Sequence, residues 1–274
     1  MAADFFAAVA ALIAEIVRDE EASVGRAADL VADAVARDRL VHLFGTGHSR
    51  LLVEDGFFRA GSLACVKPIL VPELTLSSGA LAAMEAERDI RVADLVWTRY
   101  RIEGGDVLVV FSTSGVNVVP IEVARRARSA GAGVVAIASR RYMAQAPSTH
   151  PEGLRLEDVV DVLVDNHVAL GDALVALPGL ATPVGPGSTI AGSFLLHAIF
   201  VEAVRRLLAR GITPPVYVSS KLSGADQHNA ALVARYRDRI TLLESAFRGG
   251  ETLQVPSREQ EPRSQVERAL REGG

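Results

Sequence analysis

Hydrophobic residues recur at helical spacing over the first 37 residues of the chain. Phe5, Leu12 and Ile16 belong to one apolar stripe, and a similar stripe runs from residue 24 to residue 35. Three acidic residues at positions 19–21 interrupt the pattern. We therefore expect an N-terminal helical arm over residues 1–38, with a break near the acidic run. A long amphipathic helix ahead of the first strand needs a surface to cover, in its own domain or in a second subunit.

From residue 40 onwards, short apolar runs rich in β-branched residues alternate with helical patterns. The predicted strands span residues 40–44, 64–70, 107–111, 133–138 and 159–164. The predicted helices span residues 49–60, 79–100 (a pair), 118–130, 189–210 and 224–239. Strands of this kind, separated by helices, are typical of a parallel sheet buried on both faces. We predict an α/β domain over residues 39–242 with a doubly wound, five-stranded parallel sheet, followed by a polar tail over residues 243–274.

Composition narrows the class of protein. The 274 residues include 29 basic and 33 acidic ones, so the net charge of −4 argues against a nucleic-acid partner. The single cysteine, Cys65, excludes a disulfide framework and any multi-cysteine metal site. The longest apolar helix candidate, residues 190–201, is shorter than the roughly 20 residues that a membrane span needs, and no basic segment typical of a secretory signal precedes an apolar run. We expect a cytoplasmic protein without a membrane partner.

Three loops rich in glycine and hydroxyl residues each lead into a predicted helix. They are residues 45–49 (Gly-Thr-Gly-His-Ser), 112–117 (Ser-Thr-Ser-Gly-Val-Asn) and 185–189 (Gly-Pro-Gly-Ser-Thr). Helix N-termini present unpaired amide N–H groups, glycine allows close approach, and hydroxyl groups add donors, so such loops suit a phosphate. The same residue types also serve as ordinary helix caps, but their recurrence three times favours an anion site. The candidate phosphate-binding residues are Gly47, Ser49, Ser112, Thr113, Ser114, Asn117, Ser188 and Thr189.

Several familiar nucleotide and hydrolase motifs are missing from the sequence. Neither Lys67 nor Lys221 lies in a phosphate-binding P-loop, and Arg50 occupies the place of the third glycine of a dinucleotide fingerprint. The chain has no Gly-x-Ser-x-Gly or His-Glu-x-x-His sequence. Hydroxyl and amide donors without lysine or magnesium suit a sugar phosphate better than ATP. We expect a small sugar phosphate as the ligand.

Four segments resemble the SIS (sugar isomerase) domain family, namely residues 43–49, 57–61, 111–117 and 164–172. The resemblance covers roughly residues 4–242. Within the family, the chain is similar to a bacterial branch that itself resembles the phosphoheptose isomerases. It implies a flavodoxin-like fold and phosphosugar binding by the hydroxyl groups of residues 112–114, with Ser49 and Asn117 at helix starts. Ser188 and Thr189 resemble a segment of the etherase relatives, as do residues 79–87, which there supply a glutamate. Arg59 stands where the isomerase and etherase relatives have a catalytic glutamate.

Isomerisation of an aldose to a ketose needs a base that moves a proton between adjacent carbons, and a second group for the oxygen proton. Carboxylates with raised pKa values and histidines suit these tasks. The candidates are Glu54, Asp55, Glu85, Glu87 and His48. Each carboxylate could instead lie on a solvated helix face, and His48 could have a structural role.

Asp165, Asn166 and Asp172 follow a strand and so belong to the ligand edge of the sheet, although loop capping alone would also explain them. We assign no cofactor and no metal, because the six histidines are scattered along the chain. The predicted function is a sugar-phosphate isomerase of the aldose–ketose type. A non-catalytic phosphosugar sensor and a phosphosugar etherase or lyase are the alternatives. We expect a homo-oligomer, a dimer or tetramer, that gives the N-terminal helix a partner surface.

Overall fold

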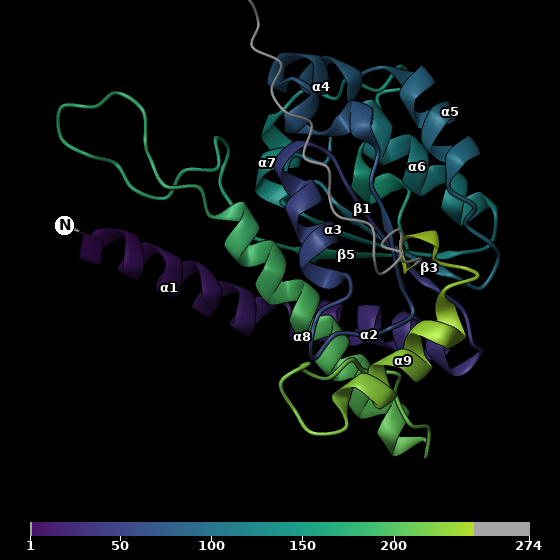
Figure 1. Cartoon of the computed structure of the whole chain (residues 1–274). Helices are drawn as coiled ribbons and strands as arrows, with labels where there is room; N and C mark the ends of the chain where they lie inside the picture. The colour runs from purple at the N-terminus through teal and green to yellow at the C-terminus, as the bar shows by residue number, and fades with distance from the viewer. Residues whose placement is uncertain (1, 244–274) are drawn as a thin grey trace, which may run out of the picture.

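A five-stranded parallel sheet forms the centre of the computed structural model, which describes residues 2–243 (Figure 1). The strands are β1 (Val41–Gly45), β2 (Val66–Ile69), β3 (Val107–Phe111), β4 (Gly133–Ala138) and β5 (Val162–Asp165). Their order in the sheet is β2-β1-β3-β4-β5, and every neighbouring pair is parallel. The predicted sheet and its five strands are therefore confirmed. The polar tail expected over residues 243–274 lies outside the described residues from residue 244 onwards.

Helices cover both faces of the sheet. The helices are α1 (Ala2–Asp19), α2 (Glu21–Ala36), α3 (Arg50–Gly56), α4 (Ala80–Ala86), α5 (Ile90–Arg99), α6 (Val118–Ser129), α7 (Arg140–Gln145), α8 (Ser188–Ala209) and α9 (Ala225–Tyr236). Leu43 and Val109 belong to a core shared with α2, α3 and α8, whereas Phe44, Leu108 and Val110 belong to a core shared with α5 and α6. Successive strand residues thus contribute to opposite faces, which is why the strands are apolar throughout.

The N-terminal arm consists of two helices with different surroundings. As predicted, a break at Glu20 separates α1 from α2. In α2, buried residues such as Val31 and Val35 join the core on one face of the sheet. Helix α1 projects away from the rest of the chain, and only Leu12 and Ile16 of it are buried (Figure 1). Between residues 2 and 243, none of the helices combines the length and the apolar character that a bilayer crossing needs.

Two strands, β2 and β5, begin later than their apolar patterns predict. The strand predicted over residues 64–70 begins at Val66, because Leu63 forms an antiparallel bridge with Val216 from the segment after α8. The strand predicted over residues 159–164 begins at Val162, because a 3-10 helix over Leu156–Asp158 with its cap at Val159 precedes it. The carboxylate of Asp161 then accepts a hydrogen bond from the amide of Val134 in β4 at 2.8 Å. These contacts come from distant parts of the chain, so the local pattern does not contain them.

The order of the strands places two of the hydroxyl-rich loops next to each other. From β1 the chain crosses to β2 on one side, and from β3 it crosses to β4 on the other, so the winding reverses between β1 and β3. Gly45 at the end of β1 is in register with Phe111 at the end of β3. Ligands in open α/β sheets bind at the carboxyl ends of the strands where the winding reverses. The loops after Gly45 and Phe111 both begin at this point.

Candidate functional site

A cavity of about 380 Å³ opens between these two loops and helix α4. Nine of the residues predicted from the sequence line it: Gly47, His48, Ser49, Glu87, Ser112, Thr113, Ser114, Asn117 and Asp172. The two loops are 63 positions or more apart in the sequence and meet only because β1 and β3 are neighbours. No arginine or lysine of the described chain lines the cavity, so an anion there would be held by neutral donors.

The loop over residues 112–117 offers a set of unused hydrogen-bond donors. Within the described part of the chain, the backbone amides of Thr113, Ser114 and Asn117 donate to no other group. Gly115 allows the sharp turn, since its φ is +62° and a Cβ there would overlap the side chain of Met143. The side chain of Asn117 does not cap α6. The loop thus presents amide and hydroxyl donors at the start of a helix, the usual arrangement for binding a phosphate.

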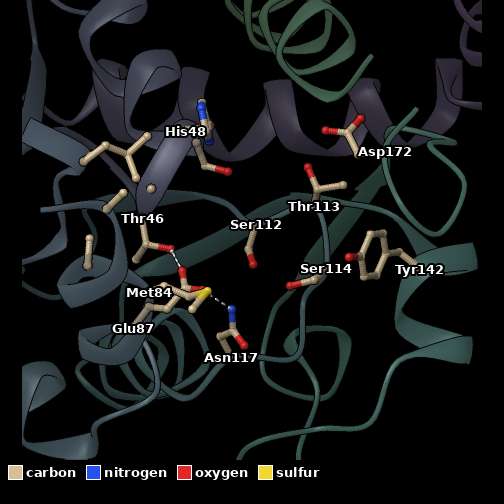
Figure 2. Close-up of a pocket in the computed structure, with 15 residues that line it drawn as sticks. Thr46, His48, Met84, Glu87, Ser112, Thr113, Ser114, Asn117, Tyr142 and Asp172 are labelled. Atoms are coloured by element: carbon tan, nitrogen blue, oxygen red, sulfur yellow. Dashed lines mark hydrogen bonds between the residues drawn. The ribbon is translucent and has the colours of Figure 1, made fainter. Parts of the chain in front are cut away.

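Glu87 faces this loop from the end of α4. Its Oε2 accepts a hydrogen bond from Thr46 Oγ1, and its Oε1 accepts one from Asn117 Nδ2, both at 2.8 Å (Figure 2). Burial raises the pKa of the Glu87 carboxyl above its usual value, and the hydrogen bond from Thr46 opposes this rise. The carbonyl of Glu87 also accepts from the amide of Val119 in α6. A carboxyl group with a raised pKa is therefore fixed between the two loops.

The first loop turns sharply before α3. A Cβ on Gly45 would lie 2.7 Å from the backbone oxygen of Ser49, so only glycine fits there. Gly47 has a φ of +54°, and the Ser49 amide donates to the carbonyl of Thr46 at 3.0 Å. His48 lies in this turn with an exposed side chain and borders the cavity. In this loop, therefore, Thr46 holds Glu87, and His48 lies at the rim of the cavity.

The third hydroxyl-rich loop is separate from the cavity. Asp172 Oδ1 accepts from the amides of Gly187 and Ser188 at 3.0 and 2.9 Å, and its Oδ2 accepts from Ser188 Oγ at 2.5 Å. The N-terminus of α8 is thus already capped by a carboxylate of the chain. Neither Ser188 nor Thr189 lines the cavity. The geometry therefore leaves no reason to assign a phosphate to this loop, whereas Asp172 itself borders the cavity.

Three of the predicted catalytic carboxylates lie elsewhere. Glu54 forms an ion pair with Arg50 one turn earlier, with Arg50 Nε 3.1 Å from Glu54 Oε1. Asp55 points toward α8, where it accepts hydrogen bonds from Ser193 Oγ at 2.7 Å and His197 Nε2 at 2.9 Å. It also forms an ion pair with Arg59, one turn later in the chain.

Glu85 is exposed on α4 and does not line the cavity, although it is only two positions from Glu87. Side chains two positions apart on a helix point in different directions. Glu87 and His48 are therefore the predicted catalytic residues that border the cavity.

The other two candidates at the ligand edge, Asp165 and Asn166, form hydrogen bonds with neighbouring loop residues. Asn166 is buried, and its Oδ1 accepts from the backbone amide of Val168 at 3.2 Å, whereas its Nδ2 donates to Thr113 Oγ1 at 3.5 Å. Asp165 is buried as well and accepts from the backbone amides of Arg140 and His167. Both hold backbone in place rather than bordering the cavity, as the capping interpretation expects.

Several lining residues were not among the sequence candidates. They are Thr46, Leu76, Ala80, Ala83, Met84 and Tyr142. Thr46 belongs to the first loop, and its hydroxyl could have been included on the same grounds as Ser49. The lining residues on α4 and α7 belong to no recognisable sequence motif. Their place at the cavity depends on how these helices pack.

Sequence comparisons match a family model over the first half of the chain and relatives over most of it. The SIS domain family model matches residues 4–139. A UPF0309 protein of Halalkalibacterium halodurans is 37% identical over 243 residues, which are 89% of this chain and 97% of the relative. A UPF0309 protein of Brucella canis is 42% identical over 219 residues, which are 80% of this chain and 88% of the relative.

Two solved structures are similar at lower sequence identity. A phosphoheptose isomerase from Neisseria gonorrhoeae has a TM-score of 0.48 and 18% identity, covering 74% of this chain and 94% of its own. The NanR protein of Vibrio vulnificus, solved in complex with ManNAc-6P, has a TM-score of 0.46 and 15% identity, covering 83% of this chain and 66% of its own.

Proposed function

This chain belongs to the UPF0309 family and carries a SIS domain, and from this premise we propose that it binds a sugar phosphate and isomerises it between aldose and ketose. The observation that supports the proposal most is the pairing of the donor loop 112–117 with Glu87 across one cavity. A ligand that spans the cavity would meet donors suited to a phosphate at one side and a carboxyl group at the other.

The phosphate binds, in this proposal, to the loop over residues 112–117. The free amides of Thr113 and Ser114 and the hydroxyl of Ser112 supply donors without a formal positive charge. Neutral donors arranged at a helix start are sufficient for phosphate, as in other α/β proteins. The donor loop fixes one end of the sugar, so that the rest of the chain of carbon atoms extends toward Glu87.

Glu87 is the proposed base. In the ionised form it takes the proton from the carbon next to the carbonyl group of the open-chain sugar and returns it to the former carbonyl carbon, through an enediol. Thr46 and Asn117 hold both carboxyl oxygens, so they position the group for this transfer. His48, at the rim, is the proposed carrier of the proton that moves between the two oxygens.

Exchange of the substrate's C2 proton with solvent tests the proposal. In deuterated water, the protein should catalyse loss of the C2 proton signal from one of a panel of hexose, heptose and N-acetylhexosamine phosphates. Glu87→Gln should lower the exchange rate by about a hundredfold or more, because it removes the base. Glu85→Gln is the matched control, since Glu85 is exposed on the same helix and outside the cavity.

Two results would contradict the isomerase proposal. One is exchange by the Glu87→Gln protein at the wild-type rate. The other is saturable binding of a sugar phosphate without any exchange, which would favour a sensor that binds without turnover.

A further inference from the structure

A second cluster of ionisable side chains lies where the turn between α1 and α2 meets the loop after β5. His167 occupies its centre, with Nε2 3.2 Å from Glu20 Oε1 and Nδ1 3.5 Å from Glu15 Oε1. One oxygen of Glu20, one oxygen of Asp165 and a ring nitrogen of His167 all lie within 4.8 Å of one another. None of these residues lines the cavity described above.

The cluster buries more negative charge than its neighbours balance. Glu20 is 8% exposed and Asp165 is 5% exposed. Within residues 2–243, neither carboxylate forms an ion pair with an arginine or lysine, and His167 is the only base among these residues that forms an ion pair with Glu20. Burying carboxylates without a matching cation is costly. The nearby Arg141 pairs with Glu15 instead.

One carboxylate oxygen in the cluster accepts no hydrogen bond from the described residues. Asp165 Oδ1 accepts from the amides of His167 at 2.8 Å and Arg140 at 3.3 Å, whereas Oδ2 accepts no hydrogen bond from any residue in the described range. Glu20 Oε2 accepts from the amide of Asp165 at 3.1 Å, which holds the glutamate against the β5 end. The backbone thus positions both carboxylates and leaves Asp165 Oδ2 available.

The chemistry of these donors suits a divalent transition metal. A histidine nitrogen combined with two carboxylate oxygens is a ligand set that Zn²⁺ and Mn²⁺ accept. Zinc bonds of about 2.1 Å in a tetrahedron place neighbouring ligand atoms roughly 3.4 Å apart. The 3.2 Å between His167 Nε2 and Glu20 Oε1 is close to that spacing. A dication would also balance the two buried carboxylates.

We propose that Glu20, Asp165 and His167 bind one divalent transition-metal ion. The ion would join the turn between α1 and α2 to the loop after β5, and so fix the position of α1 on the domain. Its role would be structural, because its ligands lie outside the cavity. The proposal is independent of the sugar-phosphate function.

Calorimetric titration of chelator-treated full-length protein with ZnCl₂ and with MnCl₂ tests the site. We expect one ion to bind per chain and to raise the melting temperature. Loss of a residue that only hydrogen-bonds to a metal ligand typically lowers the affinity for the metal roughly 10- to 100-fold. Glu20 and His167 are the proposed ligands themselves, so Glu20→Gln and His167→Gln should each lower the affinity by about a hundredfold or more. Glutamine at position 20 keeps an oxygen for the Asp165 amide, which protects the fold.

Two substitutions of the same kind serve as controls. Glu21→Gln changes an exposed neighbour, and His228→Gln changes a histidine whose Nε2 faces the carbonyl of Val216. Both should leave the affinity unchanged. The proposal is overturned if the wild-type protein binds neither metal at micromolar concentration, or if folded Glu20→Gln and His167→Gln proteins bind as tightly as the controls. Circular dichroism of the metal-free proteins establishes that each variant is folded.

Discussion

At the scale of single residues, Thr46 and Glu87 form the pair on which the proposed chemistry depends most. Burial raises the pKa of the Glu87 carboxyl, and the hydrogen bond from Thr46 Oγ1 limits the rise. Thr46 is buried at the end of β1, so its hydroxyl has a fixed direction. Thr46 is therefore a positioning residue that tunes the acidity of Glu87.

We predict that Thr46→Val raises the pKa of Glu87 further, because the variant loses a hydrogen bond that favours the ionised carboxylate. Carbon-13 NMR titration of the labelled glutamate carboxyls measures this directly. Thr98→Val is the control, since Thr98 is exposed and donates to the carbonyl of Asp94 within α5. An unchanged or lower pKa in Thr46→Val would show that the hydrogen bond does not stabilise the carboxylate.

The sequence located many site residues but could not rank the carboxylates. The loop over residues 112–117 follows a buried strand, so its place at the ligand edge follows from the pattern alone. Each of the carboxylates Glu54, Asp55, Glu85 and Glu87 lies in a predicted helix, and the direction of each depends on packing. Asp55 points toward α8 because Ser193 and His197 lie there, more than 130 positions later.

At the scale of elements, the start of α8 shows how a hydroxyl-rich loop can be complete without a ligand. Asp172 satisfies the amides of Gly187 and Ser188, which would otherwise be unpaired donors. Glycine, serine and threonine before a helix are compatible with both an anion site and a cap. The sequence could not distinguish them, because the capping carboxylate comes from 16 residues earlier.

We predict that Asp172→Ala lowers the free energy of unfolding by about 1 kcal/mol, the typical cost of removing a helix cap. Urea denaturation followed by circular dichroism measures the loss. Asp226→Ala, an exposed residue in the first turn of α9, is the control and should change the stability by about 0.5 kcal/mol or less. Equal effects of the two substitutions would contradict the assignment of Asp172 as the cap.

At the scale of the whole molecule, the projecting helix α1 exposes apolar side chains beside α8. Phe6 and Val17 of α1 are 67% and 59% exposed, and Val201 of α8 is 60% exposed. A cavity of about 830 Å³ lies between these helices and is lined in part by Val17, Phe194 and Val201. Adjacent exposed apolar residues of this kind mark association surfaces. We propose that a second copy of the chain covers them.

Sedimentation velocity tests this prediction at micromolar protein concentration. The wild-type protein should sediment as a dimer or tetramer, and Val17→Asp with Val201→Asp should shift it toward the monomer, because buried charges at an interface are costly. Leu222→Asp, at an exposed position before α9, should leave the assembly unchanged. A monomeric wild-type protein would contradict the proposal.

The fold itself followed from the sequence to a large extent. Five apolar runs and the helices between them were sufficient to predict a doubly wound parallel sheet, since each strand had to be buried on both faces. The apolar runs alone did not give the strand order, because it depends on which crossovers pack against each face, but the flavodoxin-like fold that the resemblance implies has the order β2-β1-β3-β4-β5 that the structure shows. The structure adds the register that brings together the loops after Gly45 and Phe111.

The central claim is that residues 112–117 hold the phosphate group of a sugar. Calorimetric titration of wild-type protein and of Ser112→Ala with Ser114→Ala, using the sugar-phosphate panel and the same sugars without phosphate, tests it most directly. We predict that at least one phosphate ester binds the wild-type protein, that its parent sugar binds at least tenfold more weakly, and that the double variant loses the preference. Thr189→Ala, in the loop outside the cavity, should bind like wild type. Equal affinity of the double variant and wild type for the phosphate ester, or no binding by any member of the panel, would contradict the claim.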